Sequence, residues 1–216
     1  MSGDQQRKVR NIIRWQRIGC IVVKISETLD VSLKEALLNR DWDIITVQQV
    51  STQSPDYSTY QPYLEKLVEY VRLCAPKAKI AVHQTWAYEQ GCPRLTEKMG
   101  YSDYTQMLCD VVKSYQTAAE HIGADYLIPS GEVFGAMVEN GIEKIHRDHH
   151  HASLGLGRYA LGLIWYKTLT GNDVLENTFC DLDEEVTSEQ IAIAKKCVQE
   201  VSERYARESS CCGCLR

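Results

Sequence analysis

The sequence lacks three features that would each indicate a particular class of protein. It contains no run of about 18 uninterrupted apolar residues, so it predicts no membrane-spanning helix. It has no surplus of basic residues, since its formal net charge is −5, and it therefore gives no basis for nucleic-acid binding. It has no secretory signal, because Arg14 and Arg17 interrupt the first apolar stretch and no small-residue cleavage site follows. A protein that acts on a small molecule is the default expectation.

Nine cysteines are present, but the chain does not need a disulfide framework. With 216 residues, of which 44% are hydrophobic, it is long enough to bury a core without cross-links. Five cysteines stand in apolar or helical patterns and are interpreted as reduced, buried thiols: Cys20, Cys74, Cys109, Cys180 and Cys197. These features favour the cytoplasm for the chain as given, and a signal on a lost amino-terminal segment stays an open alternative.

The last residues, SSCCGCLR, contain Cys211, Cys212 and Cys214. A prenylation box would need a cysteine fourth from the end, where Gly213 stands. We interpret this tail, residues 208–216, as a frayed terminus, with a metal or redox role for the three cysteines as the alternative. The tail and an atypical amino-terminal segment, residues 1–30, would flank a single domain over residues 31–207.

Helix and strand patterns alternate through this domain. Ser32 and Glu35 form a capping box that predicts a short helix, and the β-branched run that follows predicts a strand within residues 41–51. Apolar periodicity and cap residues predict further helices over 60–74, 104–123, 131–140, 156–171 and from Thr187 onward, with strands within 79–85 and 124–130. The predicted fold is an α/β/α three-layer sandwich around a mainly parallel sheet.

Polar residues follow each predicted strand at its carboxyl end, where open parallel sheets bind ligands. We expect the following side chains to face one space: Gln48, Gln49 and Ser51 after the first strand, His83, Gln84, Thr85 and Trp86 after the second, and Ser130 and Glu132 after the third. The two glutamine amides could hold an oxyanion or a sugar hydroxyl, while His83 and Trp86 could form a polar and aromatic wall. The alternatives are that one glutamine binds the backbone and that Trp86 is a core residue.

The stretch EKIHRDHHHASLGLGRY, residues 143–159, gathers four histidines around one aspartate. Asp148 and His151 have the spacing D-x-x-H, at which a turn lets the carboxylate bind Nδ1 of the imidazole. His151 would then be the general base of a nucleophilic hydrolase. A metal site formed by His146, His149 and either Asp148 or His150 is the second hypothesis, and a solvated loop is the third. We favour the first and expect neither a metal nor another cofactor, because three consecutive histidines point in divergent directions.

Three blocks of the chain resemble, in this order, an uncharacterised bacterial family of the SGNH (GDSL-like) hydrolase superfamily: WDIITVQQVS, YQPYLEKLVEYVRLCAPKAKIAVHQTWAY and RDHHHASLGLGRYALGLIWYKTLTG. The resemblance extends from about Val31 to Phe179. It implies a flavodoxin-like sandwich that cleaves esters, often acetyl groups on carbohydrates, without a metal. It also implies that Asp148 and His151 are the Asp and His of a catalytic triad.

The same resemblance implies a nucleophilic serine in a Gly-x-Ser motif after a first, central strand, and the amino-terminal part of the sequence does not contain this motif. Ser26 follows a β-branched run, but it lacks the glycine that a tight turn requires. Gln48 and Gln49 stand where the superfamily keeps its oxyanion-hole Gly and Asn blocks, and they match neither. We therefore expect a chain that begins downstream of the nucleophile and whose sheet lacks the first strand.

These observations support hypotheses from different classes, and they leave open whether the chain is an enzyme. The first is an SGNH-type serine esterase domain for ester or acylated-carbohydrate substrates, with little or no activity as written. The second is a non-catalytic binding protein with a rim pocket formed by Gln48, His83, Trp86 and His151. The third is a metal-dependent hydrolase that uses the histidine cluster. In each case we expect a small-molecule or carbohydrate ligand, without nucleic acid or membrane as partner, and the oligomeric state stays undetermined.

Overall fold

The computed structural model describes residues 12–18, 21–27 and 31–212. The chain divides into two compact units, one formed by residues 1–44 and 66–78 and the other by residues 45–65 and 79–216. Apart from Ser26, every residue that we predicted for a site belongs to the second unit. Within the described residues, no helix is both long enough and apolar enough to cross a membrane.

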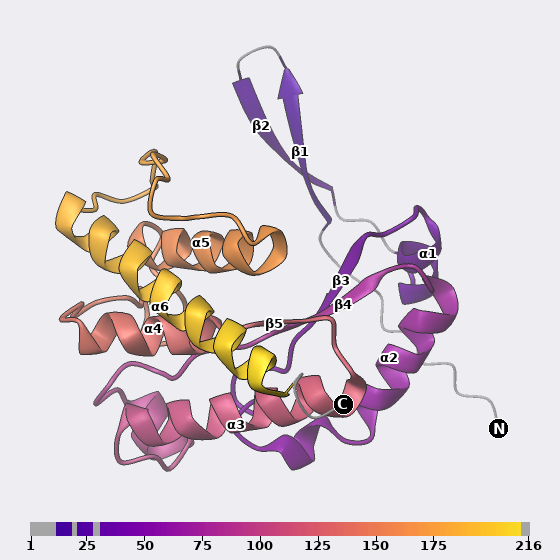
Figure 1. Ribbon diagram of the computed structural model, residues 1–216, viewed down its shortest axis with the longest axis horizontal. Helices are drawn as coiled ribbons and strands as arrows, with labels where there is room; N and C mark the ends of the chain where they lie inside the picture. The colour runs from indigo at the N-terminus through magenta and orange to yellow at the C-terminus, as the bar shows by residue number, and fades with distance from the viewer. Residues whose placement is uncertain (1–11, 19–20, 28–30, 213–216) are drawn as a thin grey trace. The chain divides into compact units, whose positions relative to one another are not determined.

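The first unit contains a hairpin that the sequence analysis did not predict. Strands β1 (Ile12–Ile18) and β2 (Ile21–Glu27) pair in an antiparallel register and form a two-stranded sheet of their own (Figure 1). Helix α1 (Leu33–Leu38) follows, and its predicted capping box is confirmed: the backbone N–H of Glu35 donates to Oγ of Ser32 at 3.2 Å, and the backbone N–H of Ser32 donates to the Glu35 carboxylate at 2.7 Å. Most of α2 (Tyr63–Cys74) also belongs to this unit.

The main sheet has the strand order β3-β4-β5, formed by β3 (Ile44–Val47), β4 (Lys79–His83) and β5 (Tyr126–Ile128). Strands β4 and β5 are parallel, with His83 opposite Ile128. Among the described residues, the strands that precede β3 pair in the separate hairpin and do not join this sheet. The carboxyl ends of β4 and β5 therefore lie at the same edge of the sheet.

Helices cover both sides of the strands, which confirms the predicted three-layer α/β fold. A 3-10 turn (Tyr57–Tyr60) and a π-helical turn (Arg94–Lys98) precede α3 (Tyr104–Ile122), and α4 (Ser130–Glu139), α5 (Leu156–Thr170) and α6 (Ser188–Cys212) complete the chain. Helix α3 contacts β4 and β5, α5 contacts β5, and Figure 1 shows these two helices on opposite sides of the strands. Helix α6 packs on α4 and α5.

Predicted caps end two of these helices. Gly123 and Gly171 follow α3 and α5 in the left-handed conformation, with φ of 56° and 73°, as the C-cap signals predict. At the start of α6, the backbone N–H of Gln190 donates to Oγ1 of Thr187 at 3.2 Å, and the backbone N–H of Thr187 donates to the Gln190 side chain at 3.0 Å. Local sequence thus positions three helix ends of the second unit.

The core of the second unit is apolar, but the prediction of buried cysteines is only partly right. Fully buried side chains from strands and helices meet in it, among them Ile80, Val82, Met107, Val111, Tyr115, Ile128, Met137, Ile164 and Val198. Cys197 is buried as expected, Cys74 is half-buried, and Cys109 and Cys180 are exposed. Cys109 lies on the solvent side of the amphipathic α3, and Cys180 lies in the segment between α5 and α6. Cys20 lies outside the described residues.

Candidate functional site

The carboxyl ends of the strands bring together three of the polar residues predicted for this edge. Gln48 follows β3, His83 is the last residue of β4, and Ser130 opens α4 two residues after β5. The amide nitrogen of Gln48 lies 3.1 Å from Nδ1 of His83, and Oγ of Ser130 lies 3.0 Å from Nε2 of the same ring. One imidazole therefore links all three strand ends.

Trp165 on α5 determines which nitrogen of His83 carries the proton. An indole N–H can only donate, and Nε1 of Trp165 lies 3.2 Å from Nε2 of His83. Nε2 is therefore an acceptor, and the proton of the neutral ring resides on Nδ1. Nδ1 then donates to Gln48, which requires the amide of Gln48 to be turned so that its oxygen faces the ring.

His83 and Ser130 are at the distance of a base and a nucleophile, but their environment does not suit that chemistry. Ser130 is 0% exposed, so a substrate carbonyl does not reach its hydroxyl in this structure. Burial lowers the pKa of His83 to about 4, so the ring is neutral and only weakly basic at neutral pH. In the described part of the chain, the partner of Nδ1 is the amide of Gln48 and not a carboxylate. The cluster is thus a neutral hydrogen-bond network.

Gln49, the second glutamine after β3, is occupied by the backbone. Its amide nitrogen donates to the backbone oxygen of Thr59 at 3.1 Å, and its amide oxygen accepts from the backbone N–H of Val50 at 2.8 Å. Gln49 therefore follows the alternative in which one of two adjacent glutamines binds the backbone. Its contacts argue against the predicted oxyanion or substrate contact, and only Gln48 points to His83.

Two further predicted residues lie between the strand ends and the histidine-rich segment. Oγ of Ser51 is 2.9 Å from the hydroxyl oxygen of Tyr88. Trp86 packs on Phe134 with ring centroids 4.9 Å apart, and its indole N–H donates to the backbone oxygen of His150 at 2.8 Å. The segment after β4 therefore contacts the histidine-rich segment in which the D-x-x-H sequence lies.

This histidine loop, residues 146–152, is closed on itself and fixed to the segment after β4. An isolated antiparallel bridge joins His146 to Ala152, and the backbone N–H of Arg147 donates to the backbone oxygen of His151 at 3.0 Å. The backbone N–H of Glu89 donates to the backbone oxygen of His149 at 2.8 Å. As the sequence analysis expected, the loop reaches the same edge as the residues that follow the strands.

Asp148 and His151 are in direct contact within the loop. Nδ1 of His151 lies 2.7 Å from Oδ2 of Asp148, and the backbone N–H of His151 donates to Oδ1 at 2.9 Å. These two hydrogen bonds, the side-chain bond first, hold the pKa of Asp148 well below its ordinary range, so the carboxylate is charged at neutral pH. The side chain of His151 is 54% exposed, and its Nε2 has no hydrogen-bond partner among the described residues. The distance is the one that D-x-x-H predicts, and the catalytic role stays a prediction.

The other three histidines of the loop have different hydrogen-bond partners. His146 is buried with Nε2 3.1 Å from the backbone oxygen of Ala87, and burial lowers its pKa. His149 has a φ of 69° and places Nδ1 2.9 Å from the carboxylate of Glu89. The metal-ligand set that includes both His146 and His149 is therefore not assembled. Instead, His150 turns towards Asp148 and His151, as one donor atom from each of these residues lies within 4.8 Å of the others.

No serine of the described chain hydrogen-bonds to His151 in this structure. Ser26 lies inside β2, paired in register with Ile13, and not at a turn from a strand to a helix. A Gly-x-Ser sequence occurs at residues 100–102, but it precedes α3, and Oγ of Ser102 donates to Gln106 at 3.1 Å. Within the described residues, the acid–base pair thus lacks a nucleophile in contact.

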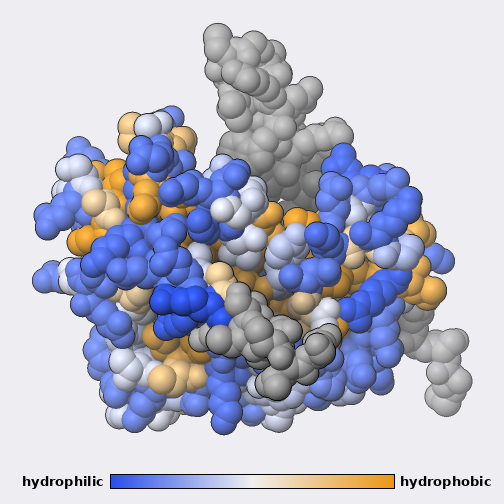
Figure 2. All heavy atoms as spheres, in the orientation of Figure 1, coloured by the Kyte–Doolittle hydropathy of each residue, from blue (hydrophilic) through white to orange (hydrophobic). Residues whose placement is uncertain are grey.

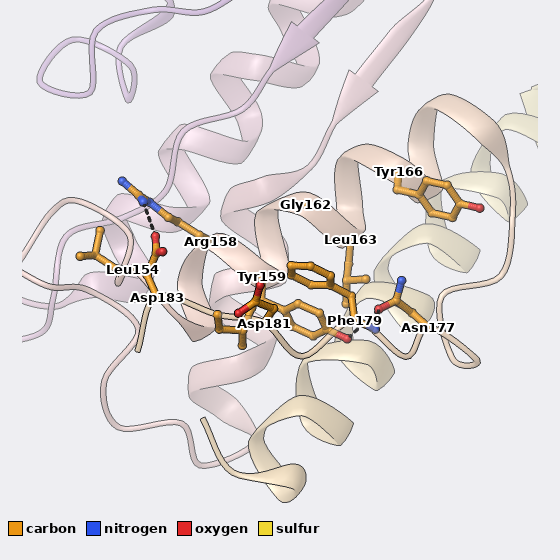
Figure 3. Close-up of a pocket in the computed structure, with 11 residues that line it drawn as sticks. Leu154, Arg158, Tyr159, Gly162, Leu163, Tyr166, Asn177, Phe179, Asp181 and Asp183 are labelled. Carbon is orange, nitrogen blue, oxygen red and sulfur yellow. Dashed lines mark hydrogen bonds and ion pairs between the residues drawn. The ribbon is translucent and has the colours of Figure 1, made fainter. Parts of the chain in front are cut away.

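A pocket of about 380 Å³ lies elsewhere in the second unit, along α5 and residues 177–183 (Figure 3). Apolar and aromatic side chains such as Tyr159 and Phe179 line it, and Arg158 and Asp183 form an ion pair at 3.0 Å. Figure 2 shows hydrophobic atoms gathered near the segment that joins α5 to α6, where Leu175 and Phe179 are exposed. None of the predicted site residues lines this pocket.

Comparisons with known proteins place the chain in a family. The sequence model of the family described as "Domain of unknown function (DUF4886)" matches residues 4–201. The chain belongs to the DUF4886 family. No protein of curated function matches it significantly.

Two solved structures resemble this DUF4886 chain. A DUF4886 family protein from Bacteroides uniformis shares 28% sequence identity, with a TM-score of 0.75, over 82% of this chain and 68% of that protein. A proposed SGNH hydrolase from Slackia heliotrinireducens shares 23% identity, with a TM-score of 0.53, over 63% of this chain and 70% of that protein. The second likeness concerns the fold alone. The bacterial family that the sequence resembles is thus identified as DUF4886.

Proposed function

We propose that this chain is a serine-esterase domain of SGNH type, in which Asp148 and His151 are the acid–base half of a catalytic triad. The observation that carries the proposal is the 2.7 Å contact between Nδ1 of His151 and Oδ2 of Asp148. The fold similarity to the Slackia heliotrinireducens protein supports it. Esters, including acylated carbohydrates, are the substrate class that we propose.

The contact prepares His151 for general base catalysis. Nδ1–H donates to the charged Asp148, so the lone pair resides on Nε2, which is on an exposed side chain without a partner among the described residues. Nε2 would take the proton of a serine hydroxyl as its oxygen attacks the ester carbonyl. The imidazolium would then give that proton to the departing alcohol, and water would release the acyl group by the same route.

The nucleophile is the part of the triad that we propose this chain does not supply. His83 and Ser130 do not substitute for it, because Ser130 is buried and His83 has a lowered pKa. We therefore expect the chain as given to be unreactive. A Gly-x-Ser segment from the amino-terminal part of a family relative, fused to the chain or added as a peptide, should complete the site.

Labelling with a fluorophosphonate probe, which reacts covalently with activated serines, tests the proposal. The chain alone should stay unlabelled, and the chain with the Gly-x-Ser segment should be labelled on that serine. His151→Ala should abolish this labelling. His149→Asn is the matched control, because asparagine tolerates the left-handed conformation at φ 69° and His149 does not contact Asp148.

Three results would overturn the proposal. Labelling that survives His151→Ala would remove His151 from the mechanism. Labelling of the unmodified chain at Ser130 would show that Ser130 and His83, and not His151, form the reactive pair. Failure of the complemented, folded chain to react would favour the second candidate, non-catalytic ligand binding, which the absence of a nucleophile in contact with His151 within the described residues already supports.

A further inference from the structure

The histidine loop contains a second arrangement of donor atoms around Asp148. Nδ1 of His150 lies 3.0 Å from the backbone oxygen of Asp148 and 3.2 Å from its Oδ1, while Nδ1 of His151 lies 2.7 Å from Oδ2. One donor atom from each of the three residues lies within 4.8 Å of the others. Two imidazole nitrogens and one carboxylate from a stretch of four residues thus lie close enough together to be ligands of one ion.

Packing holds His150 in this orientation. Its side chain is only 20% exposed, and its ring lies edge-on to Tyr88, with centroids 5.8 Å apart. On its other side, the centroid of His151 is 3.8 Å away. The backbone oxygen of His150 is fixed by the indole N–H of Trp86. The donor atom of His150 is therefore partly preorganised, unlike the side chain of His149, which is directed to Glu89.

The donor set and its spacing suit a divalent transition-metal ion. In a tetrahedral zinc site with bonds of about 2.0–2.2 Å, neighbouring ligand atoms are roughly 3.3 Å apart. One ligand atom from each of the three residues lies within 4.8 Å of the others, so each separation would have to change by at most about 1.5 Å to reach that value. Imidazole selects zinc, copper and nickel, whereas magnesium and calcium prefer oxygen ligands alone.

We propose that Asp148, His150 and His151 form a binding site for a divalent transition-metal ion such as zinc, and that the bound ion disables His151 as a base. The site itself is independent of the proposed function, and only its inhibitory effect rests on that function. The ion is thus a regulator that competes with the acid–base pair, and not a cofactor of hydrolysis.

The competition follows from the two nitrogens of one imidazole. A metal on Nδ1 of His151 takes the position of the proton that bonds to Asp148. The proton of the neutral ring then resides on Nε2. Nε2 no longer has a lone pair with which to accept the proton of a serine hydroxyl. Arg147 opposes the ion, because its Nε lies 3.6 Å from Oδ2 of Asp148, so we expect reversible binding.

Calorimetric titration of the tag-free, 216-residue chain with zinc chloride tests the site. Because Cys211, Cys212 and Cys214 offer thiolates, every protein in the series should have these three residues replaced by serine. The parent should bind one zinc ion at the site. His150→Phe keeps a ring against Tyr88 but removes the nitrogen, and should weaken this binding by about 10-fold or more. His149→Asn, the matched control, should bind as the parent does.

Thermal unfolding should first show that both variants are folded. Absence of zinc binding by the parent, or equal binding by His150→Phe, would overturn the site. Binding of magnesium as tight as that of zinc would also overturn it, because an oxygen-only surface site would then explain the result.

The inhibitory effect is tested on the chain complemented with the Gly-x-Ser segment. Zinc should suppress fluorophosphonate labelling of the parent, a chelator should restore it, and His150→Phe should stay labelled in the presence of zinc. Labelling of the zinc-saturated parent at the metal-free rate would overturn the competition. If the complemented chain is never labelled, the proposed function fails, and the calorimetric difference between parent and His150→Phe still decides the metal site.

Discussion

His83 and His151 are two histidines with opposite surroundings in one unit of the molecule. His83 contacts Gln48, Ser130 and Trp165, and burial lowers its pKa to about 4. His151 has an exposed side chain and one strong partner, the charged carboxylate of Asp148. A histidine next to a serine is therefore not by itself a catalytic pair. The accessible nitrogen and the carboxylate behind it make His151 the better candidate for the general base that we propose.

Because their surroundings differ, mutations of His83 and His151 should have different consequences, on stability in one case and on reactivity in the other. Removal of His83 deprives partly buried donors and acceptors on three elements of their partner, so stability should suffer. Removal of His151 breaks a contact between residues that are about half exposed, so reactivity should suffer while the fold persists. The predictions below test this separation, from the largest effect to the smallest.

His151→Gln should abolish reactivity of the complemented chain without unfolding it. Loss of the base in a serine triad costs several orders of magnitude, and we expect the rate of fluorophosphonate labelling to fall by about 10⁴-fold or more. A time course of labelling, with samples quenched at successive times, gives the labelling rate. Urea unfolding should give a free energy within about 0.5 kcal/mol of the parent, because surface substitutions have small effects. A large loss of stability would erase the contrast with His83.

His83→Ala should destabilise the native state by about 3–4 kcal/mol, because it deletes a largely buried ring and leaves the Ser130 hydroxyl and the Trp165 indole N–H without their partner. Urea unfolding followed by circular dichroism measures this change. His121→Ala, at an exposed position on α3, is the control and should change the free energy of unfolding by about 0.5 kcal/mol or less. A His83→Ala protein as stable as the parent would show that the network contributes nothing.

Acidification should destabilise the parent more than His83→Gln. The pKa of His83 is about 4 in the native state, against about 6.5 in the unfolded chain. The contribution of neutral His83 to the free energy of unfolding is therefore fully present above a pH of about 6.5. It falls as the pH drops to about 4, because between these two values only the unfolded chain binds the proton. The loss from His83 reaches at most about 3 kcal/mol. Urea unfolding at pH 7.5 and 4.5 compares the two proteins. His146, whose pKa is also lowered, contributes equally to the loss of stability in both. Equal losses would contradict the lowered pKa.

Replacement of two glycines of the second unit by alanine should change the free energy of unfolding in opposite directions. A Cβ at Gly131 would lie 2.3 Å from the backbone oxygen of Thr85, so Gly131→Ala should destabilise the strand-end network by about 1–3 kcal/mol. A Cβ at Gly162, inside α5, would meet nothing within 4 Å. Gly162→Ala should stabilise the helix by about 0.5–1 kcal/mol. Thermal unfolding measures both, and destabilisation at Gly162 would reveal an unrecognised contact on the pocket side of α5.

Much of the fold could be predicted because its signals are local. The capping boxes at Ser32 and Thr187 and the C-cap glycines Gly123 and Gly171 each act within one helical turn. The hairpin of β1 and β2 escaped prediction, because the antiparallel pairing of two strands has no local signal comparable to a cap residue. The exposed Cys109 and Cys180 were misjudged, because composition does not tell which side of a helix, or which part of a connecting segment, faces solvent.

The candidate site divides in the same way. Asp148 and His151 are three residues apart, so a single turn brings their side chains together, and the spacing alone was sufficient to predict the contact. Trp165 could not be found in advance, because a tryptophan in an apolar helix has the pattern of a core residue. Its bond to His83 joins residues 82 positions apart and exists only because α5 packs beside the strands.

The sequence by itself determined the helices and strands of the second unit, several of their ends and the D-x-x-H pair, since each depends on interactions within a few residues of chain. Only the tertiary structure decided which glutamine points to His83, which histidine is buried, and which of the four clustered histidines shares Asp148 with His151. Those outcomes depend on how strand ends, helices and the histidine loop pack. Burial and distant partners determine the charge and reach of a side chain, and neither is encoded in the spacing of its neighbours.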